Sequence, residues 1–153
     1  MKMPRTSVKS RIAAAAILAV LISACAPNVP HTNLTVRCSE TLTHSDVTDG
    51  SAAGTGRCAL TGLVHDSGRA TDYRTQNGQR ALIRRVVTGA KGTITFLISI
   101  NLGGPGPAGE PWKITSGTKT YTRLHGHGYQ VVDNYTGSPA TFVLKGTVTR
   151  ARA

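Results

Sequence analysis

Apolar residues recur at every second position through much of this chain, and this spacing constrains the fold more than any other feature. The clearest run has threonine and serine interspersed among four apolar residues, Ile94, Phe96, Ile98 and Ile100. A period of two is typical of a β-strand with one buried face, because successive side chains point to opposite faces of a sheet. No amphipathic pattern of helix length follows residue 24. The chain is therefore predicted to be all-β.

The same alternation predicts a set of strands along the chain, at residues 34–38, 58–64, 81–87, 112–117, 129–134 and 140–148, with a helical turn as the alternative for 81–87. Between them, residues 65–78 and 101–110 are rich in polar residues, glycine or proline and are predicted to be loops, and residues 43–56 are predicted to be a surface loop with room for a short strand. Asn77-Gly78 is a hairpin signal. Seven or eight strands in sequence favour a small antiparallel β-barrel whose last strand pairs with the first. A β-sandwich is the alternative.

Residues 111–128 read P-W-K-I-T-S-G-T-K-T-Y-T-R-L-H-G-H-G and contain the single tryptophan. Trp112 and Ile114 have strand spacing, and turn residues follow at 116–118. Tyr121 and Leu124 lie three apart, so both reach the core only if the chain kinks between them. A new strand is then expected at the glycines 126 and 128.

This stretch resembles the W-x-I-x-x-G-T-x-x-Y-x-x-L-x-G-x-G signature of bacterial proteins with an allene oxide cyclase barrel-like domain. The resemblance covers about residues 111–150 and implies a calycin-like antiparallel barrel. It also suggests a cavity that binds or cyclises a small apolar ligand, lined by aromatic residues. The candidates for cavity or core are Phe96, Trp112, Tyr121 and Phe142. Because a barrel of eight strands is just wide enough for side chains to fill it, we expect a filled core.

The first 24 residues have the composition of a signal peptide, with a basic start followed by an apolar run that is too short to span a bilayer. The run ends Leu21-Ile22-Ser23-Ala24-Cys25, which resembles a bacterial lipobox. The resemblance implies diacylglycerol transfer to Cys25, and several acyl chains hold a protein stably to a membrane. The chain is thus predicted to comprise a signal peptide (1–24), a lipidated tether (25–32) and a barrel domain (33–153). An ordinary secretory signal is the alternative.

Two cysteines remain after Cys25, and an even pair in an exported domain predicts a disulfide between Cys38 and Cys58. Both occupy the apolar side of their strands, so the bond should lie on the inner face. A metal site at His125 and His127, completed by His65 or Asp133, is the weaker interpretation of the His-x-His spacing. Solvent-facing histidines are favoured, and no metal or other cofactor is expected.

The chain has 18 Lys and Arg against seven Asp and Glu. Without residues 1–24 there are 14 basic against seven acidic residues, a net charge of +7 with neutral histidine. This charge favours anionic lipid or cell-wall polymer as a partner. Nucleic acid is not expected, because basic and aromatic residues are not interleaved. The densest basic group is predicted to be a solvated strand edge, Arg80, Arg84, Arg85 and Lys91.

The sequence shows no arrangement that is typical of catalysis. There is no G-x-S-x-G nucleophile elbow, no glycine-rich phosphate loop followed by a helix, and no evident pair of carboxylates. The favoured hypothesis is therefore a non-enzymatic binding or envelope-associated module, anchored by lipid on the extracytoplasmic face of a membrane. A cavity that binds a small apolar ligand, or isomerises one as allene oxide cyclases do, is the alternative.

Overall fold

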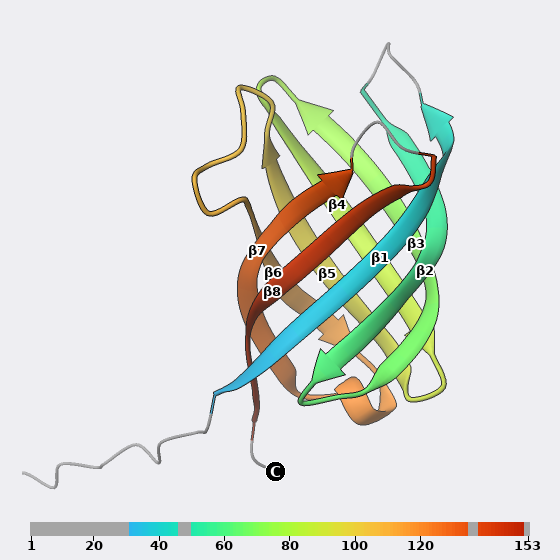
Figure 1. The fold of residues 1–153 in the computed structure, drawn as a ribbon, viewed down its shortest axis with the longest axis vertical. Helices are drawn as coiled ribbons and strands as arrows, with labels where there is room; N and C mark the ends of the chain where they lie inside the picture. Colours follow the sequence, from blue (N-terminus) through green and yellow to red (C-terminus); the bar gives the residue numbers. More distant parts are fainter. Residues whose placement is uncertain (1–30, 46–49, 135–137, 152–153) are drawn as a thin grey trace, which may run out of the picture.

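The computed structural model describes residues 31–45, 50–134 and 138–151, and these form a closed antiparallel barrel of eight strands (Figure 1). Each strand pairs with the next along the chain, and the last strand pairs with the first. The predicted all-β class and barrel are confirmed, and the alternative of a β-sandwich is wrong. The predicted signal peptide and Cys25 lie outside the described residues, and no described helix is long and apolar enough to cross a membrane.

The strands have these bounds: β1 Thr32–Ser45, β2 Ala52–Gly62, β3 Asp66–Asn77, β4 Arg80–Gly89, β5 Gly92–Asn101, β6 Glu110–Gly117, β7 Leu124–Asn134 and β8 Ala140–Arg150. One short 3-10 helix, η1 (Lys119–Tyr121), connects β6 to β7. It provides the kink that the spacing of Tyr121 and Leu124 predicts, and both side chains are buried.

The barrel has two different ends, which are visible in Figure 1. At the first, β1 begins, β8 ends and η1 lies, and we call it the closed end. Tyr121 and Leu124 pack into the barrel there, 1% and 4% exposed. The opposite end carries the Gly78-Gln79 hairpin turn and the loop at 102–109, and we call it the mouth.

The core follows the predicted alternation through the closed half of the barrel. The even-numbered residues of β1, β5 and β8 point inward, including Val36, Phe96 and Leu144, each with no exposed surface. The rings of Phe96 and Trp112 pack edge to face, with their centroids 5.5 Å apart. This apolar packing, continuous from β1 round to β8, is the main source of stability.

The described part of the structure has more strand than predicted in two stretches. Residues 65–78 were expected to be a loop, but β3 occupies most of them, and β1 and β2 both extend into 43–56. The pattern in β3 is hidden because its inward residues are not large and apolar: two are small, Gly68 and Ala70, and the next two are charged, Asp72 and Arg74. Pairing with β2 and β4 on both sides holds this polar segment as a strand. The Asn77-Gly78 hairpin is confirmed, with Gly78 at a φ of 59°.

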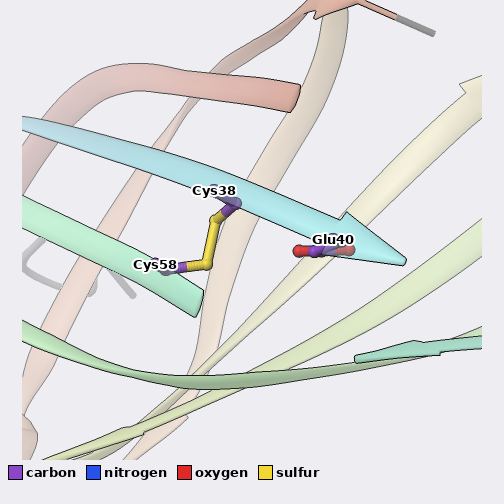
Figure 2. A group of neighbouring side chains, drawn as sticks. All are labelled: Cys38, Glu40 and Cys58. Carbon is purple, nitrogen blue, oxygen red and sulfur yellow. A yellow bond between two sulfur atoms is a disulfide. The ribbon is translucent and has the colours of Figure 1, made fainter. Parts of the chain in front are cut away.

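The predicted disulfide joins Cys38 on β1 to Cys58 on β2, which are direct partners in the ladder (Figure 2). Both cysteines are buried on the inner face, as expected. Glu40 follows Cys38 by two residues and therefore points into the same interior. Its ladder partner on β2 is Gly56, where a Cβ would lie only 2.8 Å from Cγ of Glu40. A glycine is needed there because the two strands and the glutamate leave no room.

Candidate functional site

The mouth half of the barrel encloses a cavity of about 870 Å³. Its wall is mainly apolar, formed by inward residues near the mouth ends of the strands together with the proline-containing loop at 102–109. The principal apolar side chains are Leu42, Ile83, Ile100, Val132, Ala140 and Phe142. The expectation of a filled interior therefore describes the closed half of the barrel but not the mouth half. A hollow of this size is within the range of small-molecule sites.

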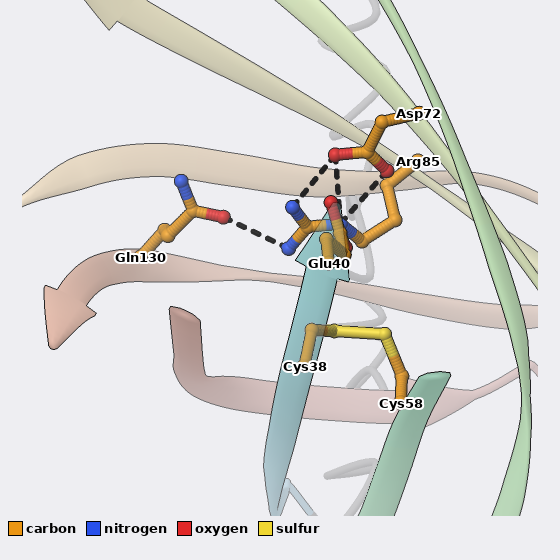
Figure 3. Close-up of polar contacts among 6 residues, drawn as sticks. All are labelled: Cys38, Glu40, Cys58, Asp72, Arg85 and Gln130. Carbon is orange, nitrogen blue, oxygen red and sulfur yellow. Dashed lines mark hydrogen bonds and ion pairs between the residues drawn. A yellow bond between two sulfur atoms is a disulfide. The ribbon is translucent and has the colours of Figure 1, made fainter. Parts of the chain in front are cut away.

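Glu40, Asp72 and Gln130 form the polar floor of the cavity, and all three meet the guanidinium of Arg85 of β4, which is buried behind them (Figure 3). Nε of Arg85 donates to both carboxylate oxygens of Asp72, at 3.0 and 3.2 Å, and Nη2 donates to Oδ2 at 2.7 Å. Nη1 donates to Oε1 of Gln130 on β7 at 3.0 Å. Oε1 of Glu40 lies 2.8 Å from Nε of Arg85. Four strands thus bring two acids, an amide and a guanidinium together inside the barrel.

Glu40 is held as a neutral acid in this cluster. Burial raises its pKa, and the neighbouring Asp72 carboxylate raises it further through a hydrogen bond and its charge. These effects outweigh the attraction of Arg85, so the pKa of Glu40 is raised from its ordinary 4.5 to about 8. The geometry agrees, because Oε1 of Glu40 accepts no hydrogen bond despite its short distance from Arg85. The single N–H on Nε is already directed at Asp72.

Arg85 remains a cation although it has no exposed surface. Burial lowers its pKa, but the carboxylate of Asp72 and then Glu40 raise it more, and the net pKa is raised. At neutral pH the cluster therefore pairs one cation, Arg85, with one anion, Asp72, and carries one protonated carboxyl group, Glu40. The floor is close to electrically neutral and offers polar atoms to a molecule in the cavity.

The aromatic residues predicted for the cavity or core divide between the two halves. Phe96, Trp112 and Tyr121 lie in the packed core. Phe142 is the one that lines the cavity, where its ring centroid lies 4.9 Å from Cζ of Arg85. This cation–π contact joins the apolar wall to the polar floor.

A second arginine, Arg74, lies on the cavity wall nearer the mouth. Its Nη2 donates to Oε1 of Gln76 at 3.0 Å, while its Nε is buried and has no hydrogen-bond partner. Arg74 therefore has a donor that an acceptor atom of a bound molecule could satisfy.

The structure corrects the prediction for the basic group at Arg80, Arg84, Arg85 and Lys91. Arg85 is inside the barrel rather than on a solvated edge, since β4 pairs along its length with both β3 and β5 and closure leaves no edge. The other three are exposed. The sequence pattern could have predicted this inward position, because Arg85 falls between Ile83 and Val87 in the series of alternate residues that face the interior. Glu40 likewise continues the inward series of Val36 and Cys38.

The histidines of the weaker metal interpretation do not face the interior. His125 and His127 are exposed on the outer face of β7, and His65 is exposed in the connection from β2 to β3. The side chain of Asp133 lies outside the described part of the structure. Among the described residues, Cys38, Glu40 and Cys58 do converge, with ligand atoms within 4.8 Å of one another. Since the two sulfurs are bonded to each other, they offer no thiolate to a metal.

No model of a known protein family matches the chain, and a search of curated proteins finds no relative. The candidate site therefore rests on its own geometry, which is a neutral polar floor beneath an apolar wall.

Proposed function

We propose that this protein is an exported, lipid-anchored barrel that binds a small, largely apolar molecule in its mouth cavity. The observation that carries the proposal is the cavity of about 870 Å³, walled by aliphatic and aromatic side chains above the Arg85 cluster. An apolar pocket with a few convergent polar groups is the usual form of a ligand site. The lipobox at Cys25 supports the anchor and an extracytoplasmic location.

The chemistry of the cavity indicates the kind of ligand. An apolar body would be sheltered by Ile83, Ile100 and Phe142, while a hydroxyl, carbonyl or similar neutral polar group would meet Glu40 and Gln130 on the floor. Exposed apolar residues also surround the entrance: Leu42 is 64%, Val131 48% and Leu102 39% exposed. Apolar surface at an opening eases the entry of an apolar molecule.

Titration with N-phenyl-1-naphthylamine, a neutral apolar fluorophore, tests the cavity directly. The wild-type barrel should bind it with enhanced, blue-shifted emission. Ala140→Trp places a large side chain on the cavity wall and should weaken binding at least tenfold. Ala59→Trp is the matched control, because Ala59 is exposed on the outer face of β2. Equal binding by wild type and Ala140→Trp, or no binding by wild type, would contradict the proposal.

Two further measurements address the anchor and the natural ligand. Mass spectrometry of the protein from its native membrane should find an acylated Cys25 at the mature N-terminus. An unmodified Cys25 would rule out the lipid anchor. Native mass spectrometry of the same material should find a co-purifying small molecule, and its mass would identify the ligand class.

A ring-closing isomerase is a second candidate, favoured by one observation. Glu40 and Asp72 place a carboxylic acid beside a carboxylate at the cavity floor, and such pairs serve in acid–base catalysis. Turnover of an unsaturated fatty-acid epoxide, lost in Glu40→Gln while N-phenyl-1-naphthylamine binding is retained, would support this candidate over simple binding.

A further inference from the structure

Four exposed basic residues gather at the closed end of the barrel, and we call them the basic end: Lys91, Lys119, Arg123 and Arg150. Hydrogen bonds connect the segments that carry these residues. The N–H of Thr120 donates to the carbonyl of Lys91 at 3.1 Å, and Nη2 of Arg150 donates to the carbonyl of Thr120 at 2.9 Å. The N–H of Ala151 donates to the carbonyl of Arg123 at 3.0 Å. Three segments that are distant in sequence thus present their charges together.

Little negative charge offsets the basic end. Asp66 is the acidic residue there, and its carboxylate accepts hydrogen bonds from Tyr121 Oη at 2.8 Å and from the backbone N–H groups of Lys91 and Ser67 while its charge also acts on Lys91. The other acidic residues whose side chains the structure describes line the cavity at the mouth: Glu40, Asp72 and Glu110. The four residues of the basic end thus share one acidic neighbour, Asp66, while other exposed basic residues, such as Arg57, Arg84 and Lys145, are spread singly over the outer face of the barrel.

Two of the four residues adopt a backbone conformation that their side chains disfavour. Lys119 has a φ of 50° and Arg123 a φ of 64°, in the left-handed region where glycine or asparagine is usual. Lys119 is the first residue of η1, and Arg123 follows the end of η1 by two residues. Strain of this kind is found where a site requires particular side chains, and here the side chains are both cationic.

We propose that the basic end docks on the anionic headgroups of a phospholipid bilayer. The sequence itself places the bilayer near this end, because β1 begins here, at Thr32, only seven residues along the chain from the predicted acylation site at Cys25. Seven residues reach at most about 25 Å. Acyl chains and a basic patch are the two signals that together hold a protein firmly at a membrane. Docking at the closed end orients the mouth away from the membrane, toward molecules in solution.

The test uses the mature chain from residue 25 with Cys25→Ser, so that no acyl chain is attached, and sedimentation with vesicles. The wild-type sequence should bind mixed phosphatidylglycerol and phosphatidylcholine vesicles and not phosphatidylcholine alone, and high salt should release it. Lys119→Gly/Arg123→Gly should bind roughly 25-fold more weakly, since each basic residue near an anionic surface contributes about fivefold. Glycine suits the φ of both positions, so the fold should be retained.

The matched control is Arg80→Ala/Lys113→Ala, which also removes one arginine and one lysine, from exposed positions away from the closed end. It should keep most of the binding. An equal loss in the control would show a diffuse charge effect and overturn the proposal. So would an absence of vesicle binding, or stronger retention on purified anionic wall polymer than on vesicles. None of these outcomes depends on whether the cavity binds a ligand.

Discussion

Asp72 on β3 and Arg85 on β4 are direct partners in the ladder, and both point into the barrel, where Arg85 makes three hydrogen bonds to the Asp72 carboxylate. Arg85 has no exposed surface and Asp72 is 8% exposed. Charges removed from water this completely are tolerated only when each compensates the other. The pair makes the floor of the cavity part of the folded structure as well as part of the proposed ligand site.

Removal of Arg85 should therefore be severe. Arg85→Ala would leave Asp72 buried without a counter-ion, and the free energy of unfolding should fall by about 3 kcal/mol or more in urea denaturation. Arg84→Ala, on the exposed outer face of the same strand, should change it by less than about 0.5 kcal/mol. Similar losses in the two variants would show that the cluster is not the cause.

The pKa of Glu40 predicts a dependence of stability on pH. The folded pKa, about 8, is above the ordinary 4.5, so the folded state holds a proton that the unfolded state releases between these values. The contribution of Glu40 is complete below pH 4.5 and is lost as the pH rises toward 8, by up to roughly 1.4 kcal/mol per pH unit. Urea denaturation across this range should give wild type a steeper decline than Glu40→Gln, which cannot ionise. Parallel curves would contradict the raised pKa.

The disulfide should stabilise the folded barrel by the amount expected for the length of the loop that it closes. Cys38 and Cys58 are separated by 20 residues, and closing such a loop stabilises a protein by about 3 kcal/mol in the loop-entropy model. Cys38→Ala/Cys58→Ala should show this loss in thermal or urea unfolding. A reducing agent should then destabilise the wild type and leave the double variant unchanged.

Tyr121 should contribute through its hydroxyl as well as its ring. The hydroxyl donates to Oδ2 of Asp66 at 2.8 Å and so fastens η1 to the start of β3. Tyr121→Phe keeps the ring in the core and should cost about 1.5 kcal/mol, the usual value for a hydrogen bond to a charged group. Chemical denaturation measures it. In a double-mutant cycle, Asp66→Asn/Tyr121→Phe should lose less unfolding free energy than the two single variants lose in sum. Additive losses would show that the hydrogen bond between Tyr121 and Asp66 does not contribute to stability.

The same bond sets the behaviour of Asp66 in acid. Burial raises the pKa of Asp66, but the hydrogen bonds from Tyr121, Lys91 and Ser67 together with the charge of Lys91 lower it more, and the net pKa is below its ordinary 3.8. This contribution to stability is present above pH 3.8 and disappears as the pH falls through the lowered value. Acid unfolding of Tyr121→Phe should begin at a higher pH than that of the wild type.

Glycine at the strained positions should stabilise the barrel. Lys119→Gly and Arg123→Gly each relieve the strain of a left-handed φ in the folded state, and each also makes the unfolded chain more flexible. Because the first effect is the larger, each substitution should raise the free energy of unfolding by roughly 0.5 kcal/mol. Melting temperatures should therefore rise in the same variants that bind anionic vesicles less well. A fall in both would mean that these side chains support the fold rather than the membrane contact.

The sequence by itself determined the all-β class, the disulfide and the kink before β7, and it favoured a barrel over a sandwich, whereas the closure of β8 on β1 was decided by the tertiary structure. These follow from alternation, cysteine pairing and local spacing, and each is a property of one segment or of neighbouring strands. It left β3 unrecognised, because an inward face of glycine, alanine and charged residues has no apolar alternation to detect.

Only the tertiary structure decided what the inward polar residues do. Glu40, Asp72, Arg85 and Gln130 come from four strands, with up to 45 residues between hydrogen-bonded partners. Alternation predicts that each points inward, but which of them lie at the same level depends on the register in which the barrel closes. That register is the sum of many long-range strand pairings, so no local pattern could show that these side chains meet beneath a cavity.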